Sequence, residues 1–363
     1  MIIVLKNVTP LIFRRRTVFH NFVRQCTSDH SQQGFRIVFF GSDSFAVKHL
    51  TALGLNAKGK CGNVVKHLEV VSSSPKVIQR RGKKRLETSP VVDYCQTEGL
   101  PLHLWPMDSI DGFDVGVVVS FGYMIPDRLI KCFSMGVLNV HPSLLPRWRG
   151  AAPIPHTILA GDKTTGVTII RIKPDRFDVG PIVAQEEVSV PDAVTREALT
   201  ELLAIKGSNM LLQVLGNLKS SLRKERKQSE EGVTYAPKLK ASIGIINWNT
   251  TAQDVDRVFR AIDGKFPLRA TWKGEEFRLF DMVPLIENLN HPVIQDVSDI
   301  PGSMVYHKQS ETLQVRCQDG WVGFRGVGFG RRKNMTSKEF FNGFLSSSRS
   351  GNQTVLEAGR DER

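Results

Sequence analysis

The chain has 363 residues, of which 41% are hydrophobic, and its 49 Lys and Arg against 36 Asp and Glu give a formal net charge of +13. This length and apolar content allow about two domains with cores of their own, and no apolar run reaches the ~20 residues of a membrane span. The spacing of its five cysteines, Cys26, Cys61, Cys95, Cys132 and Cys317, fits neither a disulfide framework nor a structural metal site, so we expect thiols in a reducing compartment.

Residues 1–33 are predicted to be a mitochondrial transit segment, which would place the protein in the matrix. Against the single acidic residue Asp29, this segment carries Lys6, Arg14, Arg15, Arg16 and Arg24, with Ser and Thr interspersed. It lacks the cleavage site and the clean apolar core of a secretory signal, although MIIV and LIF make the distinction imperfect. A net charge of +9 remains on the rest of the chain, which favours a polyanionic partner such as nucleic acid.

An α/β catalytic domain is predicted for residues 34–218. Apolar strands are expected at 35–41, 68–73, 100–105, 114–122 and 136–141. Helices should alternate with them; one has Ser89 as its N-cap, Pro90 at its first position and Gly99 past its end. This order predicts a doubly wound, mostly parallel, Rossmann-like sheet, whose sites lie beyond the carboxyl ends of the strands.

The chain from residue 166 onward, which begins inside this domain, is predicted in four parts. Strands at 166–172 and 181–190 should form an antiparallel extension around a functional loop, KPDRFDVG, and a long helix should begin at about Thr195. The polar stretch 219–234 is interpreted as an interdomain linker. Residues 235–345, with a helix at 251–262 and hairpin signals at Lys273-Gly274 and Asp319-Gly320, predict a small OB-like β-barrel domain, a fold of which nucleic-acid binding is one known use, and 346–363 a disordered tail.

Two polar side chains stand at the end of the last parallel strand. Asn139 and His141 are two residues apart, so both side chains point to the same side of the sheet or its edge. Neither is by itself a strong nucleophile, and the pair suits direct attack by a substrate amine on a carbonyl, with oxyanion stabilisation and proton transfer from the protein. Asp178 is the carboxylate expected to orient His141, because Gly180 allows a tight turn. On spacing alone, a capped strand end and an ordinary turn fit equally well.

The whole stretch around Asn139 and His141 is a more specific signal than the spacing of these residues alone. NVHPSLLPRWRGAAPI (139–154), followed by GDKTTGVTIIRI and FDVG, resembles the formyltransferase family that uses 10-formyltetrahydrofolate. The resemblance also covers FFGSDSFAVKHL, FGYMIP and YAPKLKASIGIINW and reaches at least Phe280, most of the chain. The pattern is most similar to the branch that formylates methionine attached to initiator tRNA, in its mitochondrial form. The first turn has only Gly41 and no GxGxxG, so no dinucleotide cofactor is expected.

The resemblance implies roles for individual residues. Asn139, His141 and Asp178 would be catalytic: the first two hold the carbonyl oxygen, His141 takes the proton of the amine, and Asp178 fixes His141, directly or through water. The pterin of 10-formyltetrahydrofolate, a co-substrate, would bind the backbone around Phe121, Gly122, Tyr123, Met124 and Ile125. The wall beside the folate would be formed by Ser143, Leu144, Leu145 and Pro146. No metal is implied. Pro155 and Pro181 depart from the family pattern and bear on the loop geometry of the site.

A basic run follows the second predicted strand. VIQRRGKKRLETSP carries Arg80, Arg81, Lys83, Lys84 and Arg85 near the site end of the sheet. The resemblance implies that it approaches the acceptor end of the tRNA, whereas an ordinary solvated loop is the plain alternative. Phosphate contacts would give affinity with a steep salt dependence. Other cations, including Lys219 and Arg223 in the linker, could extend this track or be plain surface.

The sequence therefore predicts a monomeric enzyme, without membrane insertion, that formylates methionine on initiator tRNA for mitochondrial translation. Two alternatives stay open: a formyltransferase or formyl-folate hydrolase that acts on a small molecule, and a catalytically inactive RNA-binding protein that retains the fold. Formyl transfer and tRNA binding by the purified protein distinguish them.

Overall fold

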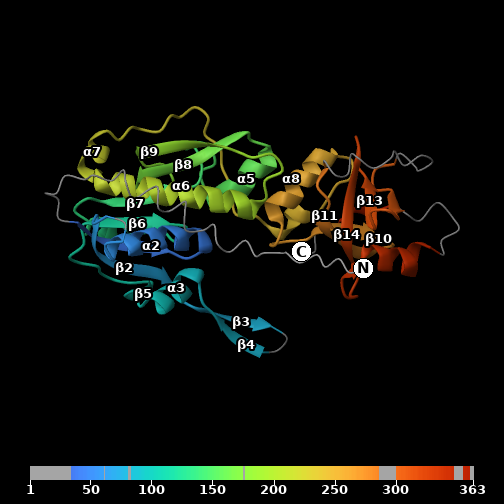
Figure 1. The fold of residues 1–363 in the computed structure, drawn as a ribbon, viewed down its shortest axis with the longest axis horizontal. Helices are drawn as coiled ribbons and strands as arrows, with labels where there is room; N and C mark the ends of the chain where they lie inside the picture. The colour runs from blue at the N-terminus through green and yellow to red at the C-terminus, as the bar shows by residue number, and fades with distance from the viewer. Residues whose placement is uncertain are drawn as a thin grey trace, which may run out of the picture.

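The computed structural model describes residues 34–60, 62–80, 83–174, 176–285, 300–346 and 355–359. The predicted transit segment lies outside the described residues, as do Cys26, Cys61 and Arg81. Figure 1 shows two domains side by side, an α/β domain coloured blue to yellow and a second domain in orange and red.

The first domain is built on a seven-stranded sheet in the order β5-β2-β1-β6-β7-β8-β9. Its strands are β1 (Phe35–Gly41), β2 (Val65–Ser73), β5 (Leu102–Trp105), β6 (Val115–Val119), β7 (Val137–His141), β8 (Thr164–Arg171) and β9 (Ile182–Ser189). The pairs from β5 to β7 are parallel, and those of β7 with β8 and β8 with β9 are antiparallel. The predicted Rossmann-like sheet with an antiparallel extension is confirmed.

Strand β1 shows why the sequences of these parallel strands are continuously apolar. Ile37 and Phe39 pack into one buried cluster, and Val38 and Phe40 into another on the opposite face of the sheet. A strand that is covered on both faces carries apolar side chains on both of them. One face is covered by α2 (Ser44–Ala57), α3 (Pro90–Glu98) and α6 (Arg196–Gly216), and the other by a segment that includes α4 (Asp127–Ile130).

The helix ends follow the predicted capping residues. The Ser89 side chain accepts a hydrogen bond from the Val92 N–H, Pro90 occupies the first turn of α3, and Gly99 ends the helix with φ +67°. Helix α6 begins after Thr195, whose side chain accepts from the Ala198 N–H. These local signals mark helix ends because Ser89, Thr195 and Gly99 satisfy backbone groups that a helix leaves unpaired, and Pro90 has no N–H that would need a partner.

The basic run after β2 forms a hairpin. Strands β3 (Lys76–Arg80) and β4 (Lys83–Glu87) pair with each other in an antiparallel two-stranded sheet that is separate from the main one. In Figure 1 the hairpin projects from the side of the domain where β2 and β5 lie. The described part of this run is therefore a hairpin and not an irregular loop.

The second domain is an antiparallel sheet in the order β12-β13-β14-β11-β10-β16, with β15 beside β14. Its elements are η1 (Ala241–Gly244), α8 (Ala252–Ile262), β10 (Leu268–Trp272), β11 (Glu275–Met282), β12 (Met304–His307), β13 (Thr312–Arg316), β14 (Trp321–Phe329), β15 (Met335–Thr336), α10 (Ser337–Phe340), the π-helix η2 (Phe341–Leu345) and β16 (Glu357–Ala358). The predicted turns at Lys273-Gly274 and Asp319-Gly320 join β10 to β11 and β13 to β14. The expected helix and short antiparallel strands are thus confirmed.

Two segments are more ordered than their composition predicted. In the stretch interpreted as a linker, α7 (Leu218–Arg223) is helical, Arg226 exchanges backbone hydrogen bonds with Ile182, and Gln228 is buried. In the predicted disordered tail, Leu356 is 2% exposed and β16 pairs with β10, so disorder is the wrong prediction for residues 355–359. Backbone pairing holds both segments, and polar composition does not reveal it.

The two domains are joined through α8, which packs against α5 (Pro153–Ala160). An Arg260 guanidinium N–H donates to the Val194 carbonyl (2.8 Å), and one buried apolar cluster continues from α6 into the second sheet. None of the described helices combines the length and apolar content of a membrane span.

Candidate active site

Asn139, His141 and Asp178 lie together at the carboxyl end of β7. Asn139 Nδ2 donates a hydrogen bond to Asp178 Oδ1 (3.1 Å), and His141 Nδ1 lies 3.5 Å from the same oxygen. Asp178 follows β8, which is the neighbour of β7 in the sheet, and the loop between β8 and β9 returns it to the strand end. The structure therefore brings together the three residues that the sequence singled out.

The hydrogen bonds of His141 indicate which ring nitrogen can take up a proton. Nε2 lies 2.9 Å from the Trp148 carbonyl oxygen, which can only accept, so the hydrogen of the neutral ring belongs on Nε2. Nδ1 then carries the lone pair. A proton that arrives at Nδ1 would lie next to the Asp178 carboxylate and form an ion pair in a site where His141 is only 5% exposed.

Asp178 is held in a constrained turn. Its Oδ2 accepts a hydrogen bond from the Gly150 N–H (2.9 Å), and its backbone has φ +56°, a region that Asp adopts more readily than most residues. A Cβ at Gly180 would lie 1.9 Å from the Arg171 carbonyl oxygen, so only glycine fits there. The tight turn expected at Gly180 is therefore present, for a steric reason.

The loop that follows β7 is fixed by buried and charged contacts. The Thr168 hydroxyl donates to the Ser143 carbonyl (2.6 Å) and accepts from the Leu145 N–H (3.1 Å). Further along, Arg147 makes a bidentate ion pair with Asp162 through Nε (2.9 Å) and Nη2 (2.6 Å), and this carboxylate raises the pKa of the guanidinium. These contacts position the Trp148 carbonyl that faces His141.

The two prolines that depart from the family pattern are accommodated. Pro155 lies in the first turn of α5, where backbone N–H groups have no acceptor within the helix. The Pro181 carbonyl accepts from the Arg171 N–H (3.0 Å), which pairs the start of β9 with β8. Neither proline interrupts an element that positions the site.

The residues implied for folate binding lie in the two loops that follow the adjacent strands β6 and β7. Val118 of β6 pairs with Asn139 of β7, so residues 121–125 and 143–146 follow those strands at the same edge of the sheet. Tyr123 and Met124 are 37% and 38% exposed, whereas the side chains of Phe121, Ile125, Ser143 and Leu145 are buried. Within the loop, the Ser143 hydroxyl donates to the Arg147 carbonyl and Leu145 packs on Ile170 and Ile182. Ser143 and Leu145 could therefore shape a binding wall only through their backbone.

Aromatic rings gather beside this edge. The ring of Phe121 lies 5.3 Å from Trp105 and 5.2 Å from Tyr123, centroid to centroid, and Trp105 lies 6.1 Å from Tyr123. Such a cluster offers flat apolar surface for a flat heterocycle. Trp105 was missed from the sequence, although its place at the carboxyl end of a parallel strand was a signal.

The residues implied for tRNA binding lie on the β3–β4 hairpin. Lys84 and Arg85 are exposed on β4, Arg80 and Lys83 pair in register at the ends of the two strands, and Arg81 lies outside the described residues. Next to these cations, Val77 and Leu86 face each other across the hairpin and are 66% and 61% exposed. The hairpin therefore presents an apolar pair together with its charges.

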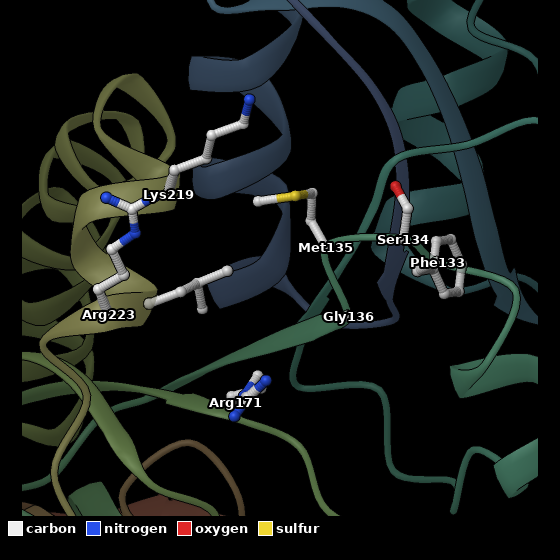
Figure 2. A pocket seen from close by; sticks show the side chains of 8 residues that line it. Phe133, Ser134, Met135, Gly136, Arg171, Lys219 and Arg223 are labelled. Carbon is white, nitrogen blue, oxygen red and sulfur yellow. The ribbon is translucent and has the colours of Figure 1, made fainter.

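A separate hollow of about 450 Å³ opens at the other end of β7 (Figure 2). It is lined by Phe133, Ser134, Met135, Gly136, Arg171, Lys219, Leu222 and Arg223. Gly136 immediately precedes β7, whereas His141 ends it, so this hollow and the cations of α7 lie away from the candidate active site. Among the described residues, no group of three or more His, Cys, Asp or Glu side chains is placed to hold a metal ion.

Comparison with protein families gives two matches. A formyl transferase profile matches residues 35–215, and a profile of the formyl transferase C-terminal domain matches residues 238–345. This chain belongs to the formyl transferase family. The resemblance that rests on the motif around Asn139 and His141 is confirmed at the level of the family.

Two curated relatives extend the comparison. The mitochondrial methionyl-tRNA formyltransferase of Homo sapiens is 44% identical over 316 residues, which cover 86% of this chain and 78% of the relative. The methionyl-tRNA formyltransferase of Methylococcus capsulatus is 32% identical over 318 residues, covering 85% of this chain and 96% of the relative.

Among solved structures, HypX from Aquifex aeolicus in complex with tetrahydrofolic acid has a TM-score of 0.55 at 17% identity over 86% of this chain, which spans 48% of HypX. The sugar 3N-formyl transferase WlaRD has a TM-score of 0.54 at 16% identity over 83% of this chain and 100% of WlaRD. At these identities the two structures show a shared fold.

Proposed function

We propose that this chain transfers the formyl group of 10-formyltetrahydrofolate to the amino group of methionyl initiator tRNA in mitochondria. The observation that carries the proposal is the 44% identity to a mitochondrial methionyl-tRNA formyltransferase over 86% of the chain, across both family domains. The sugar formyl transferase neighbour shares only the fold at 16% identity, which favours the tRNA substrate over a small molecule.

The chemistry follows from the positions of three side chains. The methionyl amine attacks the formyl carbon, a C–N bond forms, and the bond from that carbon to N10 of the folate breaks. Asn139 commits one amide N–H to Asp178, and its second N–H is the donor proposed for the oxygen of the tetrahedral intermediate. His141 takes the amine proton at Nδ1, next to Asp178, and returns a proton to the departing N10.

Folate would lie along the edge formed by residues 121–125 and 143–146. The exposed Tyr123 and the neighbouring Trp105 supply apolar surface to a pterin, and backbone groups near Gly122 supply polar partners. Leu144 and Pro146, which are partly exposed, complete the wall beside the reacting carbon. This placement puts N10 near the end of β7.

The tRNA would approach across the β3–β4 hairpin. Arg80, Arg81, Lys83, Lys84 and Arg85 are proposed to contact phosphates near the acceptor end, which adds affinity without reading sequence. Val77 and Leu86 would pack against the ribose or base surface there. Residues 238–345 of the second domain are proposed to bind more of the tRNA body.

A matrix location agrees with the relatives named mitochondrial and with the Arg-bearing, acid-poor residues 1–33, which we propose as the transit segment. All proposed catalytic residues come from one chain, so a monomer would be sufficient for activity.

The test is formyl transfer from 10-formyltetrahydrofolate by the purified chain. Charged initiator tRNA, charged elongator tRNA, free methionine and an amino sugar nucleotide are compared as acceptors. We expect rapid transfer to the charged initiator only. Preferential transfer to a free amine would support the small-molecule alternative, and tRNA binding without any transfer would support an inactive RNA-binding protein.

A further inference from the structure

We propose that Gln228, in the segment between the two family domains, is a positioning residue that sets Asp178 against Asn139 and His141. The inference rests on the proposed function. Gln228 lies between the two profile matches, which end at residue 215 and begin again at 238, and it is only 5% exposed. Because buried polar groups are normally hydrogen-bonded, a buried amide in a segment of charged residues is expected to have specific partners.

Every hydrogen-bonding group of the Gln228 amide is used. Its Nε2 donates to the carbonyl oxygens of Asp178 and Gly180, both at 2.8 Å, and its Oε1 accepts from Arg149 Nε (3.1 Å) and Nη2 (2.7 Å). Carbonyls only accept and a guanidinium only donates, so the amide can be oriented in just one way. Gln228 therefore connects the turn that carries Asp178 to the loop that carries Arg149.

Both ends of the segment are paired with the site loops as well. Arg226 exchanges backbone hydrogen bonds with Ile182 (2.7 and 2.9 Å), just after the Asp178 turn. Residues 234–236 pair with residues 149–152, through the Arg149 N–H to the Thr234 carbonyl (2.9 Å) and two further backbone bonds. Segment 226–236 thus bridges the two loops that meet at the catalytic residues.

The backbone geometry at Asp178 indicates what Gln228 and segment 226–236 hold in place. Asp178 has a left-handed backbone, which is less favourable than an extended or helical one, and Gln228 holds the carbonyl of Asp178 itself and that of Gly180, two residues later. On the other loop, Gly150 follows Arg149 and donates its N–H to Asp178 Oδ2. Without Gln228 the turn can relax and the carboxylate can move from His141 Nδ1. A displacement of about 1 Å at a reacting group can lower a rate about 100-fold.

Three variants test the proposal by steady-state formylation of charged initiator tRNA. Gln228→Ala removes all four bonds, and Gln228→Glu keeps the Arg149 pair but cannot donate to the Asp178 and Gly180 carbonyls. We expect both to lower kcat about 10- to 100-fold, with KM for folate and tRNA changed less than about threefold. Gln314→Ala is the matched control, because Gln314 is a buried glutamine of the second sheet (3% exposed), and it should keep the wild-type kcat.

A double-mutant comparison distinguishes a role of Gln228 in positioning Asp178 from a general loss of activity. If Gln228 acts through Asp178, adding Gln228→Ala to Asp178→Ala should reduce the rate little further, whereas an independent effect would multiply the two reductions. Exchange of the Gly150 amide hydrogen, which bonds to Asp178, reports the same displacement without activity and should be faster in both Gln228 variants.

Wild-type kcat and wild-type exchange at Gly150 in both variants, or fully multiplicative reductions in rate, would overturn the role of Gln228. A wild-type chain that fails to formylate tRNA would instead overturn the proposed function, and the exchange measurement would still decide the role of Gln228.

Discussion

At the scale of single residues, the candidate site depends on one carboxylate that serves three partners. Asp178 accepts from Asn139 and Gly150 and faces His141, and its position follows from a turn in which residue 180 must be glycine. The sequence pointed to Asn139, His141 and Asp178 chiefly through the resemblance of the motifs that contain them, because a strand end and a tight turn have only weak local signals. It could not predict Arg149 with Gln228, because their contact joins residues 79 positions apart.

Gly180→Ala should damage the site through the backbone. The new Cβ would meet the Arg171 carbonyl oxygen at 1.9 Å, so the turn must shift, at about 1–3 kcal/mol of stability and with a reduction in activity. Gly54→Ala in α2 is the control, because nothing lies within 4 Å of that Cβ, and it should be neutral or slightly stabilising. Urea unfolding and formylation rates measure both effects; equal behaviour of the two variants would contradict the steric argument.

His49 should make the stability depend on pH. Burial lowers its pKa from the ordinary 6.5 to about 4, and its Nε2 has no hydrogen-bond partner among the described residues. Between these values the unfolded chain binds a proton that the folded chain does not, so stability is lost as pH falls from about 6.5 toward 4. From pH 7 to pH 5 this amounts to about 2 kcal/mol.

Urea titrations of the wild type and of His49→Leu at both pH values check this expectation. The variant should lose clearly less stability on acidification than the wild type. An identical pH dependence would show that His49 is not the responsible group.

At the scale of elements, sequence signals were reliable where the signal for a strand or helix lies within that element and its capping residues. The apolar strands β1 and β7 and the capped helix α3 lie where periodicity and capping residues predicted them. The β3–β4 hairpin and β16 were not foreseen, because a two-stranded ribbon of charged residues shows little alternation and a two-residue strand none. Their existence depends on partners that spacing does not reveal.

The hairpin should govern affinity for tRNA rather than the chemical step. Reversing Lys84 and Arg85 to Glu should weaken binding of initiator tRNA and lower the salt slope by about one for each phosphate that the hairpin no longer neutralises. Reversing Lys131 and Lys163, which pair with Asp127 and Asp192, changes the net charge equally on other elements and is the control. Equal salt slopes for both variants, measured by filter binding, would exclude a specific role for the hairpin.

Residues 355–359, which include strand β16 and the preceding Leu356, should stabilise the second domain. Leu356 is buried beside Gly302 and its N–H bonds the Gly302 carbonyl (2.8 Å), so Leu356→Ala should lower the free energy of unfolding by about 2–5 kcal/mol. Thermal unfolding compares it with Ile205→Ala, a residue that is 46% exposed on α6. A shift no larger than that of the control would mean that this strand adds little.

At the scale of the whole molecule, the two family domains meet through a shared core and a shared segment. Helix α8 packs on α5, and residues 226–236, which lead into the second domain, pair with both loops of the candidate site. The net charge of +9 outside residues 1–33 fits a chain whose substrate is a polyanion. The fold, the charge and the relatives therefore agree on formylation of a charged tRNA.

The most direct measurement is single-turnover formyl transfer to methionyl initiator tRNA by the wild type, His141→Ala, Asp178→Ala and the double variant. Each single change should lower the rate by about 10²- to 10⁴-fold, and the double variant should be little worse than the poorer single one, because the residues act as a unit. A His141→Ala enzyme that transfers formyl at nearly the wild-type rate would contradict the account.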